Sequence, residues 1–290
     1  MIKLSVCVLS FEGKDVLEEC LSSIYAQKGN FELEVIVTDN GSTDGTHRMV
    51  ESNFPSVRLY VNKQNKSFTS CYNSMIKASH GSLVAIVSND IVFEDIRCFE
   101  KIISIFSENK NIGMVAPKSI RPDGTVDIIR KAKQTFYDIL KNYTLLGIAL
   151  TKLNGNNLKE TLNQEESGYS EVLQDSSIFI NKSAININSA FNENLKFYYT
   201  EDQLSLDIKR RGFGLCYTVD TQVYHHHQYT MKKAGKVRNY SIYFKDAMQY
   251  SYIFHNKILV LCLLYPLAGI TYLLRIIYWS LVKDRLKKNK

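Results

Sequence analysis

Paired cysteine spacings are missing from this sequence. Its six cysteines are scattered, with no CxxC and no other short pair, which argues against a disulfide framework and a structural zinc site, so we expect reduced thiols in the core. No GxGxxG follows the first apolar run, which disfavours a dinucleotide oxidoreductase. The sequence also lacks a domain face of basic residues interleaved with aromatics, so we expect no nucleic acid partner.

The N-terminus lacks the features of a signal peptide. The stretch "MIKLSVCVLSFEGKD" has a short apolar run that is broken by serines and soon followed by acidic residues, as in a first strand. We therefore expect the globular part to stay in the cytoplasm. Internal repeats and low-complexity linkers are absent as well. With 290 residues, 45% of them hydrophobic and 22% charged, the chain can bury a sizeable core, as one large α/β domain or a domain with an appendage.

Apolar runs of strand type alternate with stretches of helical periodicity in the first third of the chain. The predicted strands cover residues 3–11, 32–38, 56–62 and 82–88, and the predicted helices cover 14–27, 43–53 and 67–79. The first helix places five apolar residues on one face: Val16, Leu17, Cys20, Leu21 and Ile24. This alternation predicts βαβ units and a parallel sheet.

Two carboxylates follow separate predicted strands. Asp39 ends "EVIVT", and Asp90 closes the "SND" that ends "SLVAIV". Ligands of such sheets bind at the carboxyl ends of the strands, so this pair suits a nucleotide and a metal. Ordinary turn chemistry is the competing interpretation, because "DNGSTDGT" is rich in turn residues and an Asp before a helix is a common N-cap.

Six segments in a fixed order carry a family resemblance. They are "SVCVLSF", "VIVTDNGSTDGT", "NKQNKSFTSCYNSMIKASHG", "LVAIVSND", "FNENLKFYYTEDQLSLDIKRRGF" and "TQVYH". Over roughly residues 3–227 the chain resembles a family 2 glycosyltransferase of the GT-A fold, and is most similar to the bacterial rhamnosyltransferase-like branch that builds surface polysaccharides. The resemblance implies an α/β fold with a Rossmann-like mixed sheet flanked by helices.

The resemblance also implies a domain organisation. A GT-A catalytic domain would cover residues 1–230, with a donor half at about 1–117 and an acceptor half at about 118–230. The remaining residues, 231–290, would form a C-terminal helical segment that associates with the membrane.

A site for a nucleotide-sugar donor follows from the same resemblance. Asp39 would hold the nucleobase, and Asn40 and Asp44 would shape the same loop. Asn65, in "NKQNKSF", would contact the donor, although capping of its own loop explains this residue equally well. Asn89 would line the donor site next to Asp90.

A divalent cation, Mg²⁺ or Mn²⁺, is implied as a cofactor that bridges the two phosphates of the donor. Asp90 would be its ligand, since carboxylate and phosphate oxygens suit either ion. His225 matches the end of the family's last motif and would approach the metal or the diphosphate. His226 and His227 cannot both join it, because neighbouring strand residues point to opposite faces.

The stretch "YYTEDQLSLDIKRRGF" matches the family's acceptor-site motif. The resemblance makes Asp202 the catalytic base of inverting transfer and gives Glu201 a supporting or acceptor-orienting role. Thr200 is expected as the N-cap of the helix that follows. The helix dipole stabilises carboxylates in a first turn regardless of chemistry, so a structural role is the competing interpretation.

Two positions depart from the family pattern. Ser88 stands where the first Asp of a DxD-like motif would be, and Ser67 replaces the glycine of N-x-x-N-x-G-F. Both changes favour one alternative function, a catalytically inactive, membrane-tethered assembly subunit. The other alternative is a sugar-nucleotide pyrophosphorylase-like enzyme, although its glycine-rich triphosphate loop is missing after "SVCVLSF".

The function we expect is inverting transfer of a hexose from a nucleotide sugar to a glycan acceptor, lipid-linked or an oligosaccharide, in bacterial surface polysaccharide synthesis. The sequence is compatible with an oligomer. Two further features concern the membrane. The basic stretch 231–239, "MKKAGKVRN", would clamp phosphates or face lipid head groups, and the C-terminal segment would anchor the chain.

That C-terminal segment is apolar and then basic. Residues 258–274 carry no charge and contain Pro266 and Gly269, and residues 275–290 hold six basic residues of a chain with net charge +7. Seventeen uncharged residues are at the lower limit for crossing a bilayer. We therefore expect an interfacial anchor on the cytoplasmic face of the cell membrane, as two helices hinged near Pro266. A helical platform packed on protein is the alternative.

Overall fold

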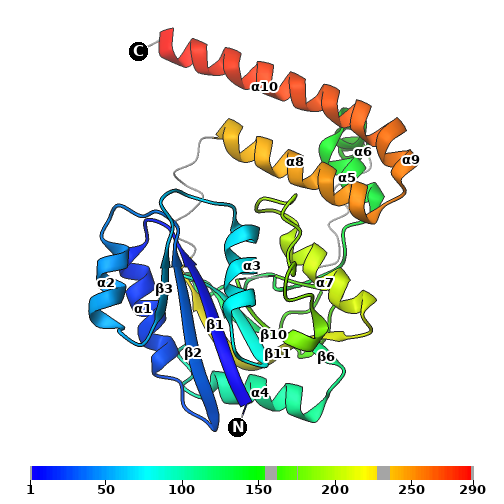
Figure 1. Cartoon of the computed structure of the whole chain (residues 1–290). Coiled ribbons are helices and arrows are strands. Elements are labelled where there is room, and N and C mark those ends of the chain that lie inside the picture. Colours follow the sequence, from blue (N-terminus) through cyan, green and yellow to red (C-terminus); the bar gives the residue numbers. More distant parts are fainter. Residues whose placement is uncertain (1, 154–161, 175, 227–235, 289–290) are drawn as a thin grey trace. The chain divides into compact units, whose positions relative to one another are not determined.

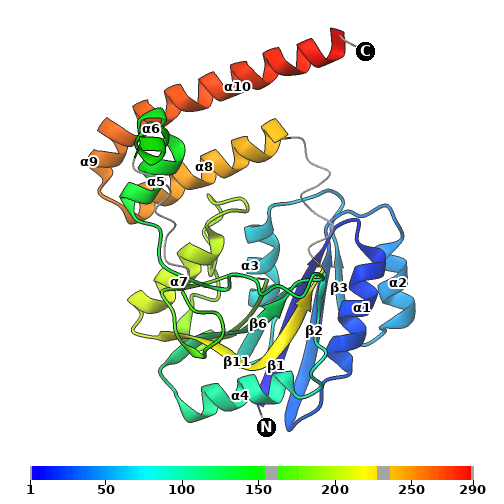
Figure 2. The same cartoon turned by 180° about the vertical axis from the view of Figure 1, so that it is seen from behind.

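The computed structural model describes residues 2–153, 162–174, 176–226 and 236–288 (Figures 1 and 2). The chain forms two compact units. Unit 1 comprises Met1–Lys133, Thr161–Glu193 and Thr200–Lys232, and unit 2 comprises Gln134–Glu160, Asn194–Tyr199 and Lys233–Lys290. The predicted domain boundary at residue 230 remains a prediction. His227 and the basic residues Lys232 and Lys233 lie outside the described residues.

Unit 1 is built on one large sheet. Its strands are β1 (Ile2–Ser10), β2 (Phe31–Asp39), β3 (Arg58–Val61), β4 (Leu83–Ser88), β5 (Ile91–Val92), β6 (Ile112–Ile120), β8 (Gly168–Tyr169), β10 (Ser177–Asn181) and β11 (Gly214–His225). Its helices are α1 (Lys14–Tyr25), α2 (Thr46–Asn53), α3 (Phe68–Ala78), α4 (Cys98–Glu108), the 3₁₀ turn η1 (Lys182–Ala184) and α7 (Thr200–Arg210). A separate two-stranded sheet pairs β7 (Arg130–Lys131) with β9 (Val172–Leu173).

The strand order is β3-β2-β1-β4-β10-β6-β11-β5, and β8 pairs with β11. The first four strands run parallel, as predicted. β10 runs antiparallel to both of its neighbours, β4 and β6, and β5 runs antiparallel to β11. The sheet is therefore mixed, with helices on both faces, which agrees with the expected fold class.

Alternate residues of a strand point to opposite faces of the sheet, and here they pack in two hydrophobic cores, one on each face. Val6 and Val8 of β1 pack in the cluster that contains apolar residues of α1, α2 and α4. Cys7, between them, packs in the other cluster with residues of α3 and α7. Because β1 is buried on both faces, it reads as a nearly continuous apolar run, which is typical of a central parallel strand.

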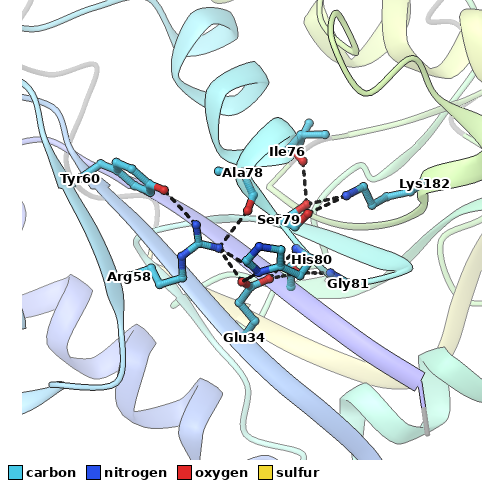
Figure 3. A network of polar contacts seen from close by, with 10 residues as sticks. Glu34, Arg58, Tyr60, Ile76, Ala78, Ser79, His80, Gly81 and Lys182 are labelled. Atoms are coloured by element: carbon cyan, nitrogen blue, oxygen red, sulfur yellow. Dashed lines mark hydrogen bonds and ion pairs between the residues drawn. The ribbon is translucent and has the colours of Figure 1, made fainter.

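A buried carboxylate ties strands β2 and β3 to the end of α3 (Figure 3). One oxygen of Glu34 accepts a hydrogen bond from Arg58 Nη1 at 2.6 Å, and the other accepts the N–H of His80 at 2.8 Å and the hydroxyl of Ser5. Burial would raise the pKa of Glu34, but the bonds from Ser5, His80 and Arg58 together lower it to about 2. This charge serves the fold and lies five residues before Asp39 on the same strand.

Unit 2 is helical. Its helices are α5 (Phe136–Tyr143), α6 (Leu145–Leu153), α8 (Lys236–Phe254), α9 (Lys257–Leu259), the π-helical turn η2 (Val260–Leu264) and α10 (Tyr265–Lys288). Val260, Leu264 and Ala268 are fully buried, and the N–H of Leu145 donates to Thr271 Oγ1 at 2.9 Å. One face of the C-terminal segment therefore packs in a protein core. The alternative interpretation, a helical platform packed on protein, predicted such packing.

The predicted hinge at Pro266 is wrong. Lys257–Trp279 forms one helical run of 23 residues, long and apolar enough to cross a membrane by length and composition. A π-helical turn immediately precedes Pro266, which occupies the second position of α10. Inside a helical run, Pro266 donates no N–H to the preceding turn, and the wider π turn before it makes room for the proline ring, so the helix continues.

The segment before α7 is held by one carboxylate. Asp246 of α8, which is 1% exposed, accepts the N–H groups of Lys196, Phe197 and Tyr198 at 2.8 to 3.0 Å. Tyr199 follows with a left-handed φ of 61°, a conformation that costs free energy for a residue with a side chain. All of these residues belong to unit 2.

The cysteines are free thiols, as predicted, but not all of them are in the core. Cys7, Cys20, Cys71 and Cys98 are buried, whereas Cys262 is exposed. Cys262 lies in η2, on the side of the apolar helix that does not face the core of unit 2. Helical periodicity places it there, between the buried residues Val260 and Leu264.

Candidate active site

Strand register brings several predicted site residues to one edge of the sheet. Ser10, the last residue of β1, lies opposite Asp39 of β2, and Leu9 lies opposite Ser88 of β4. Asp39 also lies opposite Val61, the last residue of β3. The loops that follow these strands therefore emerge side by side, which is the ligand-binding edge of a sheet of this kind.

Asp39 is fully buried. One carboxylate oxygen accepts the N–H of Ser42 at 3.0 Å. The other, Oδ2, lies 3.6 Å from His47 Nδ1 and has no hydrogen-bond partner within the described residues. A buried acceptor without a donor is costly, so Oδ2 offers a ready site for a ligand N–H.

Both polar atoms of the Asn40 side chain form hydrogen bonds with the neighbouring loop. Its Nδ2 donates to Asn65 Oδ1 at 3.1 Å and to the carbonyl of Lys66 at 3.0 Å. Its Oδ1 accepts from Asn62 Nδ2 and from the N–H of Lys66, both at 2.9 Å. Asn40 therefore fixes the loop between β3 and α3, and the bond from its Nδ2 orients the side chain of Asn65.

Ser67 caps α3. Its hydroxyl accepts the N–H of Ser70, and its φ of −67° is ordinary for a residue with a side chain. Glycine is not required here by backbone conformation, and a serine N-cap stabilises the helix that glycine would leave less well capped. One of the two departures from the family pattern thus has a structural reason.

Asp44 joins the loop after β2 to the start of α1. Its Oδ1 accepts the N–H and the hydroxyl of Thr46, and its Oδ2 accepts the N–H of Lys14 at 3.1 Å. Burial would raise the pKa of Asp44, but these hydrogen bonds lower it. Glu12, with a left-handed φ of 52°, accepts the N–H of Thr43 in the same junction. These carboxylates fix the loops after β1 and β2 through hydrogen bonds, and contact of Asp44 with a donor stays a prediction.

Asn89 lies between the loops that follow β1 and β4. Its Nδ2 donates to Ser10 Oγ at 3.1 Å. A Cβ on Gly13 would come within 2.5 Å of that nitrogen, so a larger residue at position 13 would displace the Asn89 side chain. A hollow of about 150 Å³ opens beside it, lined by Glu12, Lys14, Asp44 and their neighbours.

Asp90 and His225 meet through the pairing of β5 with β11. His225, the last residue of β11, lies opposite Ile91, and the N–H of His226 donates to the carbonyl of Asp90 at 3.0 Å. His225 Nε2 consequently lies 3.4 Å from Asp90 Oδ1. The structure thus brings together the two side chains predicted to approach one metal, and that role stays a prediction. His226 forms an ion pair with Glu19.

Asp127 contacts the other nitrogen of the same ring. His225 Nδ1 lies 3.1 Å from Asp127 Oδ2. An Asp-Gly turn at residues 123–124 folds the chain back after β6, so that the N–H of Asp127 donates to the carbonyl of Ser119. Burial would lower the pKa of His225, but the Asp127 and Asp90 carboxylates raise it to about 9.

The fit of this site to a divalent cation rests on two donors. Asp90 and His225 Nε2 supply an oxygen and a nitrogen that face each other, a set that suits Mn²⁺ and, less well, Mg²⁺. Within the described residues, no three His, Cys, Asp or Glu side chains are grouped so that they could hold an ion. The remaining ligands would have to come from diphosphate oxygens and water, which is usual for cations that bind with a nucleotide.

Asp202 and Glu201 lie in the first turn of α7, which begins at Thr200 itself, one residue earlier than the capped helix we predicted. Asp202 is 5% exposed, and Glu201 lies 3.4 Å from Lys131 Nζ. The following residues anchor the helix: Gln203 accepts the N–H of Asn192, and Ser205 Oγ accepts that of Leu173. The helix N-terminus stabilises negative charge at Asp202.

Asp127, Ser10 and Lys131 were missed by sequence reasoning. Of these only Asp127 had a local signal, the Asp-Gly turn that predicts a hairpin after β6. A larger hollow of about 370 Å³ is lined by η1 and the far end of α7, including Asp207 and Arg210. None of the predicted site residues lines it.

Comparison with known proteins places this geometry in context. Residues 5–158 match the profile of glycosyl transferase family 2. An uncharacterized glycosyltransferase of Bacillus subtilis, YfnE, is 32% identical over 94 residues, which is 31% of this chain and 24% of the relative. The abequosyltransferase RfbV of Salmonella typhimurium is 40% identical over 60 residues, 19% of this chain and 18% of the relative. The matches thus span a quarter or less of these relatives.

Solved structures resemble the whole fold more broadly. The mannosyltransferase PcManGT of Pyrobaculum calidifontis, solved with GDP-Man and Mn²⁺, superposes with a TM-score of 0.57 at 15% identity. The superposition covers 92% of this chain and 73% of that one. The expected GT-A fold is confirmed by this likeness.

Proposed function

The chain belongs to glycosyl transferase family 2, and we propose that it is an inverting glycosyltransferase that moves a sugar from a nucleotide-sugar donor to a glycan acceptor. The observation that carries this proposal lies at the carboxyl edge of the sheet, where Oδ2 of buried Asp39 has no hydrogen-bond partner within the described residues and lies beside loops fixed by Asn40 and Asp44. The solved mannosyltransferase binds GDP-Man and Mn²⁺, which supports a donor of the same class.

Asp39 recognises the nucleobase in this proposal. A base N–H donates to Oδ2, the atom that has no partner within the described residues. Asn89 and Asp90 follow β4, which pairs with β1 on the side opposite β2, and the diphosphate of the donor binds there in this proposal. Asp90 and His225 would hold a divalent cation, whose positive charge would stabilise the departing nucleoside diphosphate.

Changing Asp39 to Asn should weaken binding of the nucleoside diphosphate by about 10- to 100-fold, because one charge-assisted hydrogen bond is lost. The amide oxygen can still accept from Ser42, so the amide nitrogen takes the place of Oδ2 and faces the base with a donor. Isothermal titration with a panel of nucleoside diphosphates measures the effect. Glu32→Gln, an exposed carboxylate of the same strand, is the matched control. Equal affinities for wild type and Asp39→Asn contradict the assignment.

Transfer itself needs a base for the acceptor hydroxyl. Asp202 takes the hydroxyl proton while the oxygen attacks the anomeric carbon from the side opposite the diphosphate. The bond between that carbon and the diphosphate oxygen breaks as the new bond forms, so the configuration inverts. Glu201, held by Lys131, orients the acceptor.

The acceptor in this proposal is carried by a membrane lipid, and unit 2 lies at the cytoplasmic membrane surface. In the most apolar 18-residue stretch of Lys257–Trp279, only 22% of the residues are buried. Its exposed residues include Ile258, Leu261, Leu273, Ile277 and Tyr278, each at least 50% exposed. The buried face packs on protein while the exposed face meets lipid, and the basic residues that follow in the sequence attract anionic head groups.

Three substitutions on the exposed face, Leu261→Ser, Leu273→Ser and Ile277→Ser, should lower binding to vesicles of phosphatidylglycerol and phosphatidylethanolamine by ~10-fold or more, because burial of their apolar surface is lost. Flotation of the full chain with the vesicles measures this. Truncation after Asn256 is a poorer test, since it removes the buried Val260 and Leu264. Tyr60→Ser with Val61→Ser, exposed in unit 1, is the control, and undiminished flotation of the triple variant contradicts a lipid-facing helix.

A further inference from the structure

The carboxylate of Asp127 lies on the side of His225 that faces away from Asp90. We propose that Asp127 is a positioning residue for the cation site: it holds the His225 ring so that Nε2 presents its lone pair beside Asp90. This inference rests on the proposed function, since it takes Asp90 and His225 as ligands. Asp127 belongs to no motif that the family resemblance supplied.

The two ring nitrogens have different partners. Nδ1 lies 3.1 Å from Asp127 Oδ2, and Nε2 lies 3.4 Å from Asp90 Oδ1. An imidazole that binds a cation through Nε2 is neutral and carries its one N–H at Nδ1, where the Asp127 carboxylate accepts it. The lone pair is then at Nε2, on the side of Asp90. Histidine ligands of metals commonly donate their other N–H to a carboxylate in this way.

Asp127 is itself held in one orientation. It is 3% exposed, and Ser119 Oγ donates to its Oδ2 at 2.9 Å. Arg121 Nε donates to Oδ1 at 2.5 Å, and the N–H of Asp127 donates to the carbonyl of Ser119. A carboxylate fixed on both oxygens fixes the ring that it contacts. Strand register explains why Asp127 lies close to His225, because Ser119, which holds Asp127, lies opposite Val223, two residues before His225.

A purely structural role is the alternative. The same contacts to Ser119 and Arg121 would pin the hairpin after β6 even if His225 bound nothing. The two roles differ in what Asp127→Asn does. The amide nitrogen can donate to Nδ1 of the ring, which leaves the N–H at Nε2 and removes the lone pair from the side of Asp90. A structural role predicts a lower melting temperature with unchanged cation affinity.

The test is the affinity for Mn²⁺, measured on the full chain by electron paramagnetic resonance of the free ion in the presence of a nucleoside diphosphate. Asp127→Asn should weaken Mn²⁺ binding about 10- to 100-fold. Affinity for the nucleoside diphosphate without metal should stay at the wild-type value. Asp123→Asn removes the same charge from an exposed position of the same turn and should leave Mn²⁺ binding unchanged.

A double-mutant cycle separates action through His225 from any other effect. In a His225→Ala background, Asp127→Asn should cause no further loss of Mn²⁺ affinity. If Asp127→Asn does not fold, Ser119→Ala takes its place: weaker Mn²⁺ binding supports the proposal, and unchanged binding overturns it.

The outcomes also separate this inference from the function beneath it. Mn²⁺ binding that depends on Asp90 and His225 but is the same in wild type and Asp127→Asn overturns the role of Asp127 alone. Mn²⁺ binding that is insensitive to Asp90→Ala and His225→Ala overturns the cation site itself, and the positioning role with it.

Discussion

Asp202→Asn should reduce sugar transfer by a factor on the order of 10² to 10⁴ while donor affinity barely changes. The amide keeps the shape of the side chain and its place in the first turn of α7, but it cannot accept a proton. The acceptor hydroxyl becomes nucleophilic only as its proton leaves, so the loss falls in the chemical step. Single-turnover transfer rates and the donor dissociation constant, measured on the same variant, give the two quantities.

A residue that only stabilised the helix would behave differently. Loss of a favourable dipole interaction costs about 1 kcal/mol or less of stability and leaves turnover largely intact. Asp207→Asn is the matched control, since Asp207 lies on the same helix, is 42% exposed and pairs with Arg210. An Asp202→Asn protein that transfers sugar at the wild-type rate removes the base from the mechanism.

The second large effect is expected at Asp90. Asp90→Ala should lower turnover on the order of 10²-fold or more, because a cation that stabilises the departing diphosphate contributes several kcal/mol. EDTA should inhibit the wild type to a similar extent, and Mn²⁺ or Mg²⁺ should restore it. The measurement is turnover as a function of added metal for wild type, Asp90→Ala and His225→Ala.

Glu94→Gln is the control for that series, since Glu94 is an exposed carboxylate four residues further along the chain. Full activity of the wild type in EDTA, or unchanged turnover in Asp90→Ala, means that the diphosphate is held by protein groups alone. Ser88 stands where the family pattern has the first Asp of a DxD-like motif. In that case its presence would mark a site that has lost its metal.

Local patterns predicted the strands and helices of the first third of the chain, and they predicted that Asp39 and Asp90 lie at one edge of the sheet, for physical reasons. The run "SVCVLSF" is mostly apolar because β1 is buried on both faces, and "VIVTDNGSTDGT" changes from strand to turn where β2 ends. Asp39 and Asp90 were predictable since the carboxyl ends of parallel strands meet at one edge. The register between β1 and its two neighbours fixes that edge.

Contacts between distant parts of the chain could not be predicted in the same way. Asp127 lies 98 residues before the histidine that it contacts, and Ser10 lies 79 residues before Asn89. The assignment of residues 194–199 to unit 2 depends on hydrogen bonds to Asp246, about 50 residues later. The predicted hinge at Pro266 was wrong for a local reason. Hydropathy and proline content cannot distinguish a hinge from a continuous helix in which a π-helical turn accommodates the proline.

The central claim is transfer of a sugar from a nucleotide donor with inversion. The most direct test incubates the full chain with a panel of nucleotide sugars, Mn²⁺ and lipid-linked glycan acceptors, and measures nucleoside diphosphate release together with the anomeric configuration of the product. The account predicts release with one donor, in proportion to acceptor extended, and a product whose configuration is opposite to that of the donor. Donor consumption only in the presence of pyrophosphate, or no release with any donor and acceptor, would contradict it in favour of a pyrophosphorylase or an inactive subunit.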